Sequence, residues 1–166
     1  MDYSMLLLVL LGCPLAAALL IAVLPAKSTP RGAYETLHVL SLAGVAVAGL
    51  TLVVAAFAGS DIFALGEWFH LDGLSALFLG LIAVIAPCTG VYSLPYVAHD
   101  VAEGKLGPSQ VKQYYAFFSL FVFSMILAVT SNNIIMMWVS VEATTLSTVF
   151  LVGVYRTKLA LEAAWK

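Results

Sequence analysis

The sequence has few charged residues. Only 10% of its 166 residues are Asp, Glu, Lys or Arg, whereas 63% are hydrophobic, and the mean hydropathy is +1.05. A soluble domain usually has roughly 25% charged and about 45–50% apolar residues. Too few polar side chains are present to cover a water-facing surface. This excludes a soluble globular domain and indicates a chain surrounded by lipid.

Cysteine is equally scarce, since Cys13 and Cys88 are the only two and both lie in apolar stretches. This excludes a disulfide framework and a zinc site of CxxC spacing. Residues 10–13 resemble a bacterial lipoprotein cleavage site, but the acidic Asp2 and the apolar run beyond Cys13 favour a retained span. The sequence also lacks a phosphate-binding glycine loop and a basic patch for nucleic acid, so we expect no cofactor, metal or nucleic-acid partner.

The chain does contain long apolar runs. A bilayer core of about 30 Å requires roughly 20 apolar residues in a helix. The runs are continuous, which favours helices over barrel strands that alternate over about ten residues. We therefore predict an all-α, polytopic transmembrane bundle forming a single domain over residues 1–166. The predicted spans are residues 3–24, 36–58, 74–97, 113–130 and 134–155.

The basic residues all fall on one side of the predicted membrane. The second connection contains Asp61 and Glu67 but neither Lys nor Arg. Because cytoplasmic loops carry an excess of Lys and Arg, we predict that the N-terminus lies outside and the C-terminus in the cytoplasm. The seven basic residues are Lys27, Arg31, Lys105, Lys112, Arg156, Lys158 and Lys166.

One carboxylate, Glu142, lies deep within a predicted span. It is eight residues from the start of that span, so it lies about 12 Å down a helix. A charge at that depth costs at least about 2.5–3.5 kcal/mol, and such residues usually mark an ion or proton path. We interpret Glu142 as a proton-translocating group. The alternative is a protonated glutamate that only hydrogen-bonds a neighbouring helix.

The residues around Glu142 indicate an enclosed helix. At about 100° per residue, Trp138 and Thr145 share its face, while Ser140 and Thr144 lie on the opposite face. Small polar residues are typical of helix contacts in membranes. We therefore expect Glu142 to face a protein interior, completed by helices beyond these five or by a partner.

Other polar and special residues support simpler interpretations. Pro87 lies within the third span and predicts a helix kink, although ordinary packing is the alternative. Asp72 precedes the same span and is expected to be its N-cap. His38, His70 and His99 fall at predicted membrane edges, and we interpret them as interfacial rather than catalytic.

Several segments carry patterns of a known family. They are WFHLDGL at 68–74, TGVYS at 89–93, TSNN at 130–133, the run 137–147 and LEAAWK at 161–166. Together they resemble the antiporter-like membrane subunits shared by respiratory complex I, Mrp cation/proton antiporters and group 4 nickel–iron hydrogenases. The run 137–147 and LEAAWK point to the hydrogenase-4 branch of this family. The resemblance covers essentially the whole chain.

The resemblance implies a proton-conducting subunit of about fourteen helices, of which this chain would be the N-terminal part. The glutamate of the family's fifth helix maps onto Glu142 and works with lysines on later helices. We expect membrane and hydrophilic partner subunits of an oxidoreductase complex in a bacterial or archaeal cytoplasmic membrane. Protons, or sodium, would be the ion moved. The alternatives are an Mrp-type sodium/proton antiporter subunit and a non-transporting anchor or assembly piece.

Overall fold

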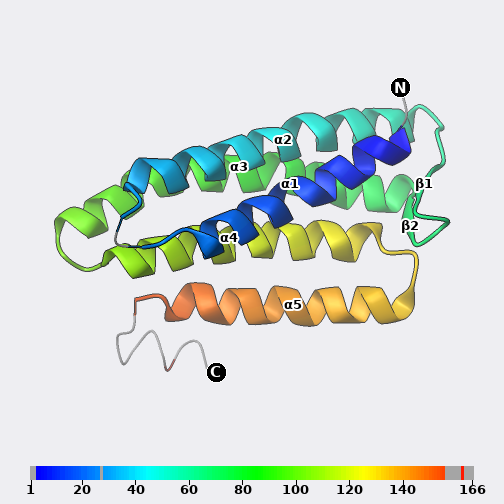
Figure 1. Ribbon diagram of the computed structural model, residues 1–166. Helices are drawn as coiled ribbons and strands as arrows, with labels where there is room; N and C mark the ends of the chain where they lie inside the picture. Colours follow the sequence, from blue (N-terminus) through cyan, green and yellow to red (C-terminus); the bar gives the residue numbers. More distant parts are fainter. Residues whose placement is uncertain (1–2, 27, 156–161, 163–166) are drawn as a thin grey trace.

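The computed structural model describes residues 3–26, 28–155 and 162. Five helices run up and down, each antiparallel to the one before it (Figure 1). Each is long and apolar enough to cross a membrane, which confirms the predicted spans. The helices are α1 (Tyr3–Val23), α2 (Arg31–Phe57), α3 (Gly73–Ala102), α4 (Pro108–Thr130) and α5 (Ile134–Gly153).

Three helix ends extend beyond the predicted apolar spans. α2 begins at Arg31 rather than at residue 36, α3 ends at Ala102 rather than at 97, and α4 begins at Pro108 rather than at 113. An ion pair stabilises the additional first turn of α2. Arg31 Nε lies 2.7 Å from Glu35 Oε1, one helical turn further along. Proline also suits the first position of a helix, where its missing N–H would have no partner. The hydropathy signal marks the lipid-facing part of each helix and misses such polar ends.

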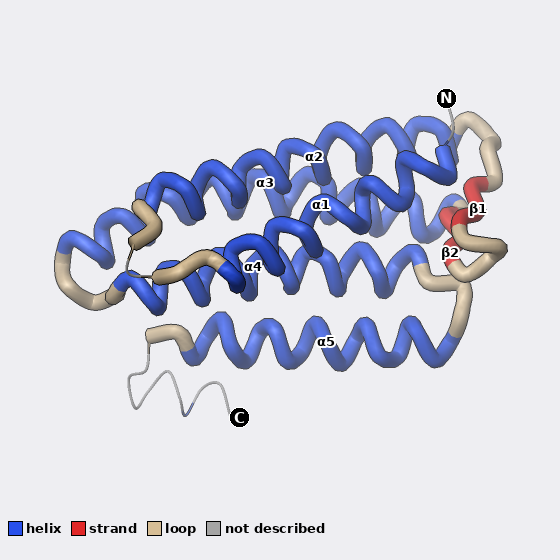
Figure 2. The backbone as a smooth tube through the Cα atoms, in the orientation of Figure 1, coloured by secondary structure: helices blue, strands red, loops and turns tan. Residues whose placement is uncertain are grey.

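The all-α class is confirmed, and the second connection adds a short β-hairpin that was not predicted. There, β1 (Ile62–Ala64) pairs antiparallel with β2 (Phe69–Leu71), as Figure 2 shows in red. Gly66 lies in the turn with φ of +61°, a conformation that glycine adopts without strain. Strands of three residues are too short to produce a readable alternation in the sequence.

The hairpin joins the α4–α5 connection. Phe69 pairs with Ser131 in an isolated bridge, and the Asn132 backbone N–H donates to the Trp68 carbonyl at 2.9 Å. The Asn132 side-chain amide also donates to the Glu67 carbonyl at 2.9 Å. These bonds fix the start of α5 relative to the rest of the bundle.

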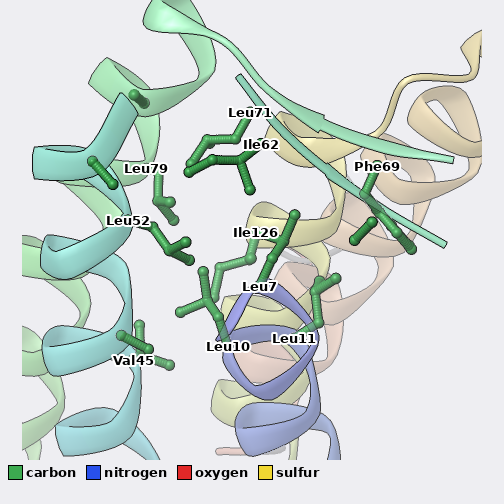
Figure 3. Close-up of a cluster of buried hydrophobic side chains, with 14 of the residues drawn as sticks. Leu7, Leu10, Leu11, Val45, Leu52, Ile62, Phe69, Leu71, Leu79 and Ile126 are labelled. Carbon is green, nitrogen blue, oxygen red and sulfur yellow. The ribbon is translucent and has the colours of Figure 1, made fainter. Parts of the chain in front are cut away.

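Leucine, isoleucine and valine side chains form the main core between α1, α2, α3 and α4 (Figure 3). Leu7, Leu10 and Leu52 are fully buried there, and Ile62 and Leu71 of the hairpin extend the cluster. The principal contacts are α1 with α2 and α4, α2 with α3, and α4 with α5. α5 therefore lies at the edge of the bundle.

Small residues allow two close helix approaches. A Cβ atom built on Gly49 of α2 would lie 2.9 Å from the Ala83 Cβ of α3, a distance that real Cβ atoms do not adopt. Cys13 of α1 lies against Gly44 of α2, where a Cβ would be 3.1 Å from the Cys13 Sγ. Such positions are typical of helix contacts in membranes, where van der Waals packing replaces the hydrophobic drive.

We predict that Gly49→Val weakens the α2–α3 contact, because two added methyl groups and the Cβ would overlap α3. Overpacking of this kind costs about 1–3 kcal/mol, and thermal unfolding in detergent should occur at a lower temperature. Gly12→Val is the matched control, since nothing lies within 4 Å of its Cβ position. Equal unfolding temperatures for the two variants would contradict the close approach.

Candidate functional site

The start of α5 is set by an asparagine N-cap. The Asn133 Oδ1 accepts hydrogen bonds from the backbone N–H groups of Ile135 at 2.9 Å and Met136 at 3.3 Å. These two amides have no partner within the helix, so the cap satisfies them. With Asn132 bonded to the hairpin, the rotation of α5 about its own axis is fixed, and with it the direction of each side chain.

One face of α5 packs against α4 through small polar residues. Ser140 and Ser147 are buried, and the Thr144 hydroxyl lies 3.1 Å from the Ser124 hydroxyl of α4. The Thr144 hydroxyl also donates to the Ser140 carbonyl at 2.8 Å. The structure thus places Ser140, Thr144 and Ser147 together at the α4–α5 contact.

Glu142 lies on the exposed face of α5, together with Trp138 and Thr145. Trp138 is 64% exposed. Across residues 3–26, 28–155 and 162, no hydrogen bond or ion pair reaches the Glu142 carboxylate. Glu142 therefore faces no interior among the described residues, and its enclosure by helices beyond these five or by a partner stays a prediction. The physical reason is that α5 is the outermost helix and contacts mainly α4.

The surface around Glu142 is apolar. Val139, Val141 and Leu146 are each more than half exposed on α5. A carboxylate at that depth in lipid would be strongly disfavoured when charged. The face therefore suits contact with further protein rather than with lipid alone.

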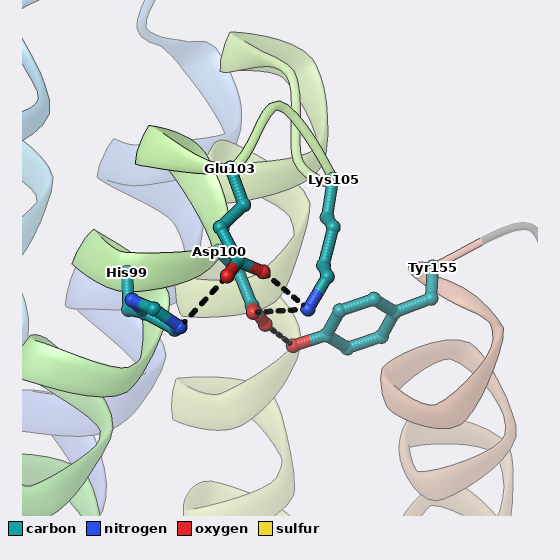
Figure 4. A network of polar contacts seen from close by, with 5 residues as sticks. All are labelled: His99, Asp100, Glu103, Lys105 and Tyr155. Carbon is teal, nitrogen blue, oxygen red and sulfur yellow. Dashed lines mark hydrogen bonds and ion pairs between the residues drawn. The ribbon is translucent and has the colours of Figure 1, made fainter.

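A polar network lies at the other end of the bundle, where α3 ends (Figure 4). The Tyr155 hydroxyl donates to Asp100 Oδ2 at 2.6 Å, and Lys105 Nζ lies 3.7 Å from Asp100 Oδ1. Lys105 also pairs with Glu103, whose other carboxylate oxygen lies 3.2 Å from His99 Nε2. The network joins the segment after α5 to the end of α3.

Asp100 was not among the predicted site residues, because the predicted third span ended at residue 97. Asp100 is 3% exposed and lies within α3. The available signal was His99 four residues before Glu103, a pair that stabilises a helical turn. Burial and the hydrogen bond to Asp100 raise the pKa of the Tyr155 phenol. Lys105 holds the pKa of Glu103 below its usual range, and Glu103 raises the pKa of Lys105.

We predict that Tyr155 stays protonated above the ordinary phenol pKa of about 10. Because its pKa is raised, the bond to Asp100 contributes stability below that pH and is lost only under more alkaline conditions. The measurement is the phenolate absorbance of the folded protein minus that of Tyr155→Phe, followed through a pH titration. The same difference taken in denaturant should titrate near pH 10. An identical midpoint in the folded protein would contradict the bond.

The histidines lie in three different settings. His38 is fully buried between α2, α3 and α4, so the interpretation of an interfacial residue was wrong. The cause is the longer α2, which places His38 two turns inside the helix. His70 stacks on Phe63 within the hairpin at 4.2 Å between ring centroids, and His99 belongs to the exposed network of Figure 4.

The remaining predicted residues concern α3. Asp72 is its N-cap as expected, because the Asp72 Oδ1 accepts from the Ser75 N–H at 2.7 Å and this bond lowers the pKa of Asp72. α3 continues through Pro87 and Pro95 as one helix, so the kink at Pro87 stays a prediction. Within the described residues, no group of three or more His, Cys, Asp or Glu could hold a metal ion.

Known proteins share sequence with this chain. It is 44% identical over 101 residues to a hydrogenase-4 component F homolog of Methylacidiphilum infernorum, covering 61% of this chain and 21% of that protein. It is 32% identical over 85 residues to NADH-quinone oxidoreductase subunit L of Campylobacter jejuni, covering 51% of this chain and 13% of the relative. Subunit L of Escherichia coli is 29% identical over 140 residues, which are 72% of this chain and 22% of that subunit.

These matches confirm the resemblance to the antiporter-like membrane subunits. The matched region is about a fifth or less of the length of each of these three relatives. A search of protein-family models found no match.

Proposed function

We propose that this chain, a relative of the antiporter-like membrane subunits, forms the N-terminal part of a proton-translocating subunit. The assembly would be a group 4 nickel–iron hydrogenase or a complex I-like respiratory complex, in a bacterial or archaeal cytoplasmic membrane. The observation that carries the proposal is Glu142, a carboxylate midway along an apolar helix. The similarity to a hydrogenase-4 component F homolog favours the hydrogenase assembly.

The position of Glu142 suits reversible protonation. A lysine ammonium brought close would favour the carboxylate and release its proton. Redox chemistry in hydrophilic partner subunits would drive this alternation. The described part of the chain has Lys105 and Lys112, and neither forms an ion pair with Glu142. The lysine would therefore come from other helices.

The exposed face of α5 supports such a completion. Only Ser140 and Ser147 of α5 are buried, whereas Glu142 and its apolar neighbours lie uncovered. Further helices of the same subunit, or of a neighbouring one, would cover this face and enclose Glu142. Arg31, Lys105 and Lys112 all lie at the bundle end remote from the hairpin (Figure 1). By the positive-inside rule, that end would be cytoplasmic and the N-terminus outside.

We predict that Glu142→Gln abolishes proton translocation while the complex still assembles, because glutamine has similar size but cannot carry a proton. The measurement is redox-driven acidification of inverted membrane vesicles containing the intact complex. Glu67→Gln is the matched control, since Glu67 lies exposed in the hairpin turn. General acid–base groups contribute about 10²–10⁴-fold to rates, so at least a tenfold loss is expected.

Unchanged acidification by the Glu142→Gln complex would defeat the proposal and favour a non-transporting anchor. Sodium-dependent pH changes in vesicles without a redox substrate would instead favour an Mrp-type antiporter. The two results are read from the same vesicles, with and without the electron donor.

A further inference from the structure

Buried polar atoms without a protein partner gather between α2 and α4. Both ring nitrogens of His38, the Ser41 and Ser119 hydroxyls and the Tyr115 hydroxyl are buried, and no hydrogen bond of good geometry reaches them among the described residues. The nearest polar groups are the Gly90 backbone for His38 and the Glu35 carboxylate for Tyr115. His38 and Tyr115 are 0% exposed, and Ser119 is 2% exposed. We call these four residues the His38 column.

The column follows the two helices inward from one end of the bundle. α2 and α4 both begin at that end (Figure 1). At 1.5 Å per residue, His38 and Tyr115 lie about 10 Å from the starts of their helices. Ser41 and Ser119 lie about 15 Å from those starts. The His38 and Tyr115 rings are in contact, with centroids 4.9 Å apart, which confirms that they share one level.

The outer end of the column is charged and open. The Tyr115 hydroxyl lies within electrostatic reach of the Glu35 carboxylate, and Glu35 pairs with Arg31 at 2.7 Å. Arg31, with Tyr34 and Val111, lines a cavity of about 180 Å³ at the bundle end. The side chain of Arg31 is 40% exposed. Arg31 therefore belongs both to this cavity and to the ion pair with Glu35, the carboxylate beside Tyr115.

The third wall of the column is the α3 backbone at Gly90. A Cβ atom there would lie 3.0 Å from His38 Nε2 and would overlap the Leu42 side chain. The absence of a side chain at Gly90 thus makes room for the imidazole. The Gly90 carbonyl already accepts from the Ser93 hydroxyl at 2.7 Å. The edge of Phe118, at 4.8 Å between centroids, closes the ring's remaining side.

Such a cluster is costly unless other molecules satisfy it. A buried donor or acceptor left unpaired costs about 1–3 kcal/mol, and here several lie together. Buried water commonly satisfies groups of this kind, making about three hydrogen bonds each. An imidazole has two ring nitrogens, so it can accept a proton on one of them and release a proton from the other. Hydroxyl groups on both sides of it would hold the water that delivers them.

We propose that the His38 column is a hydrated proton path, with His38 as its proton carrier and the Arg31–Glu35 pair at its mouth. One ring nitrogen takes a proton from a hydronium ion on the Glu35 side, leaving water. The imidazolium then gives the proton on its other nitrogen to a water at Ser41 and Ser119, and a tautomer exchange restores the ring. That this transfer feeds translocation rests on the proposed function.

The first test is His38→Phe in the vesicle assay described for Glu142. Phenylalanine fills the ring's space but carries no proton, so the acidification rate should fall at least about tenfold. His99→Phe is the matched control, since His99 lies exposed at the end of α3 and should leave the rate unchanged. Assembly and the unfolding temperature of His38→Phe are measured alongside, so that a loss of folding is distinguished from a loss of proton transfer.

The outcomes separate this inference from the role of Glu142. Normal acidification with His38→Phe, together with loss in Glu142→Gln, would overturn the column and leave the proposed function standing. Loss in His38→Phe with normal Glu142→Gln would overturn the role of Glu142 alone.

A second measurement keeps the inference testable should His38→Phe fail to fold. In the wild-type chain with ¹⁵N-labelled histidine in lipid bilayers, solid-state NMR should transfer magnetisation from water to the His38 nitrogens. Ser41→Ala and Ser119→Ala together should weaken that transfer. If no magnetisation passes from water to the His38 nitrogens, His38 is not hydrated and the proposed proton path is wrong.

Discussion

The constraint that shapes this protein is that a bilayer offers no hydrogen-bond partner to a backbone amide. Each span must satisfy its amides internally, which leaves helices as the fold for continuous apolar runs. The exceptions lie where the chain leaves the helices. There Asn133 caps α5, Asp72 caps α3, and a short hairpin pairs with the α4–α5 connection. These caps and the hairpin fix where each helix begins, and so fix the direction in which its side chains point.

Two sets of polar side chains lie within the apolar spans, Glu142 and the His38 column, and their surroundings differ. Glu142 lies on the outer surface of α5 among apolar side chains, and no ion pair reaches its carboxylate among the described residues. The His38 column lies inside the four-helix core, already enclosed by α2, α3 and α4. The first group is the basis of the proposed function. The second indicates a hydrated interior that these helices build by themselves.

α5 is less deeply buried in the bundle than the other four helices, and this bears on the proposed function. α1 to α4 share one core, whereas α5 is joined by small polar contacts to α4, by the hairpin at one end and by the Asp100–Tyr155 bond at the other. Such an arrangement holds α5 in place while leaving one of its faces free for other helices.

The sequence by itself determined the class of the protein, the number of spans and the face of α5 on which Glu142 lies, because hydropathy and helical periodicity are local properties. It also identified the Asp72 cap. It could not place Asp100, which lies beyond the predicted end of the third span at residue 97. It also set His38 only two residues inside the second span, whereas α2 begins at Arg31. The burial of His38 depends on Gly90 and Tyr115, which are distant along the chain. Only the tertiary structure brings those residues together. Only the tertiary structure, likewise, shows that the Glu142 side chain is exposed on α5.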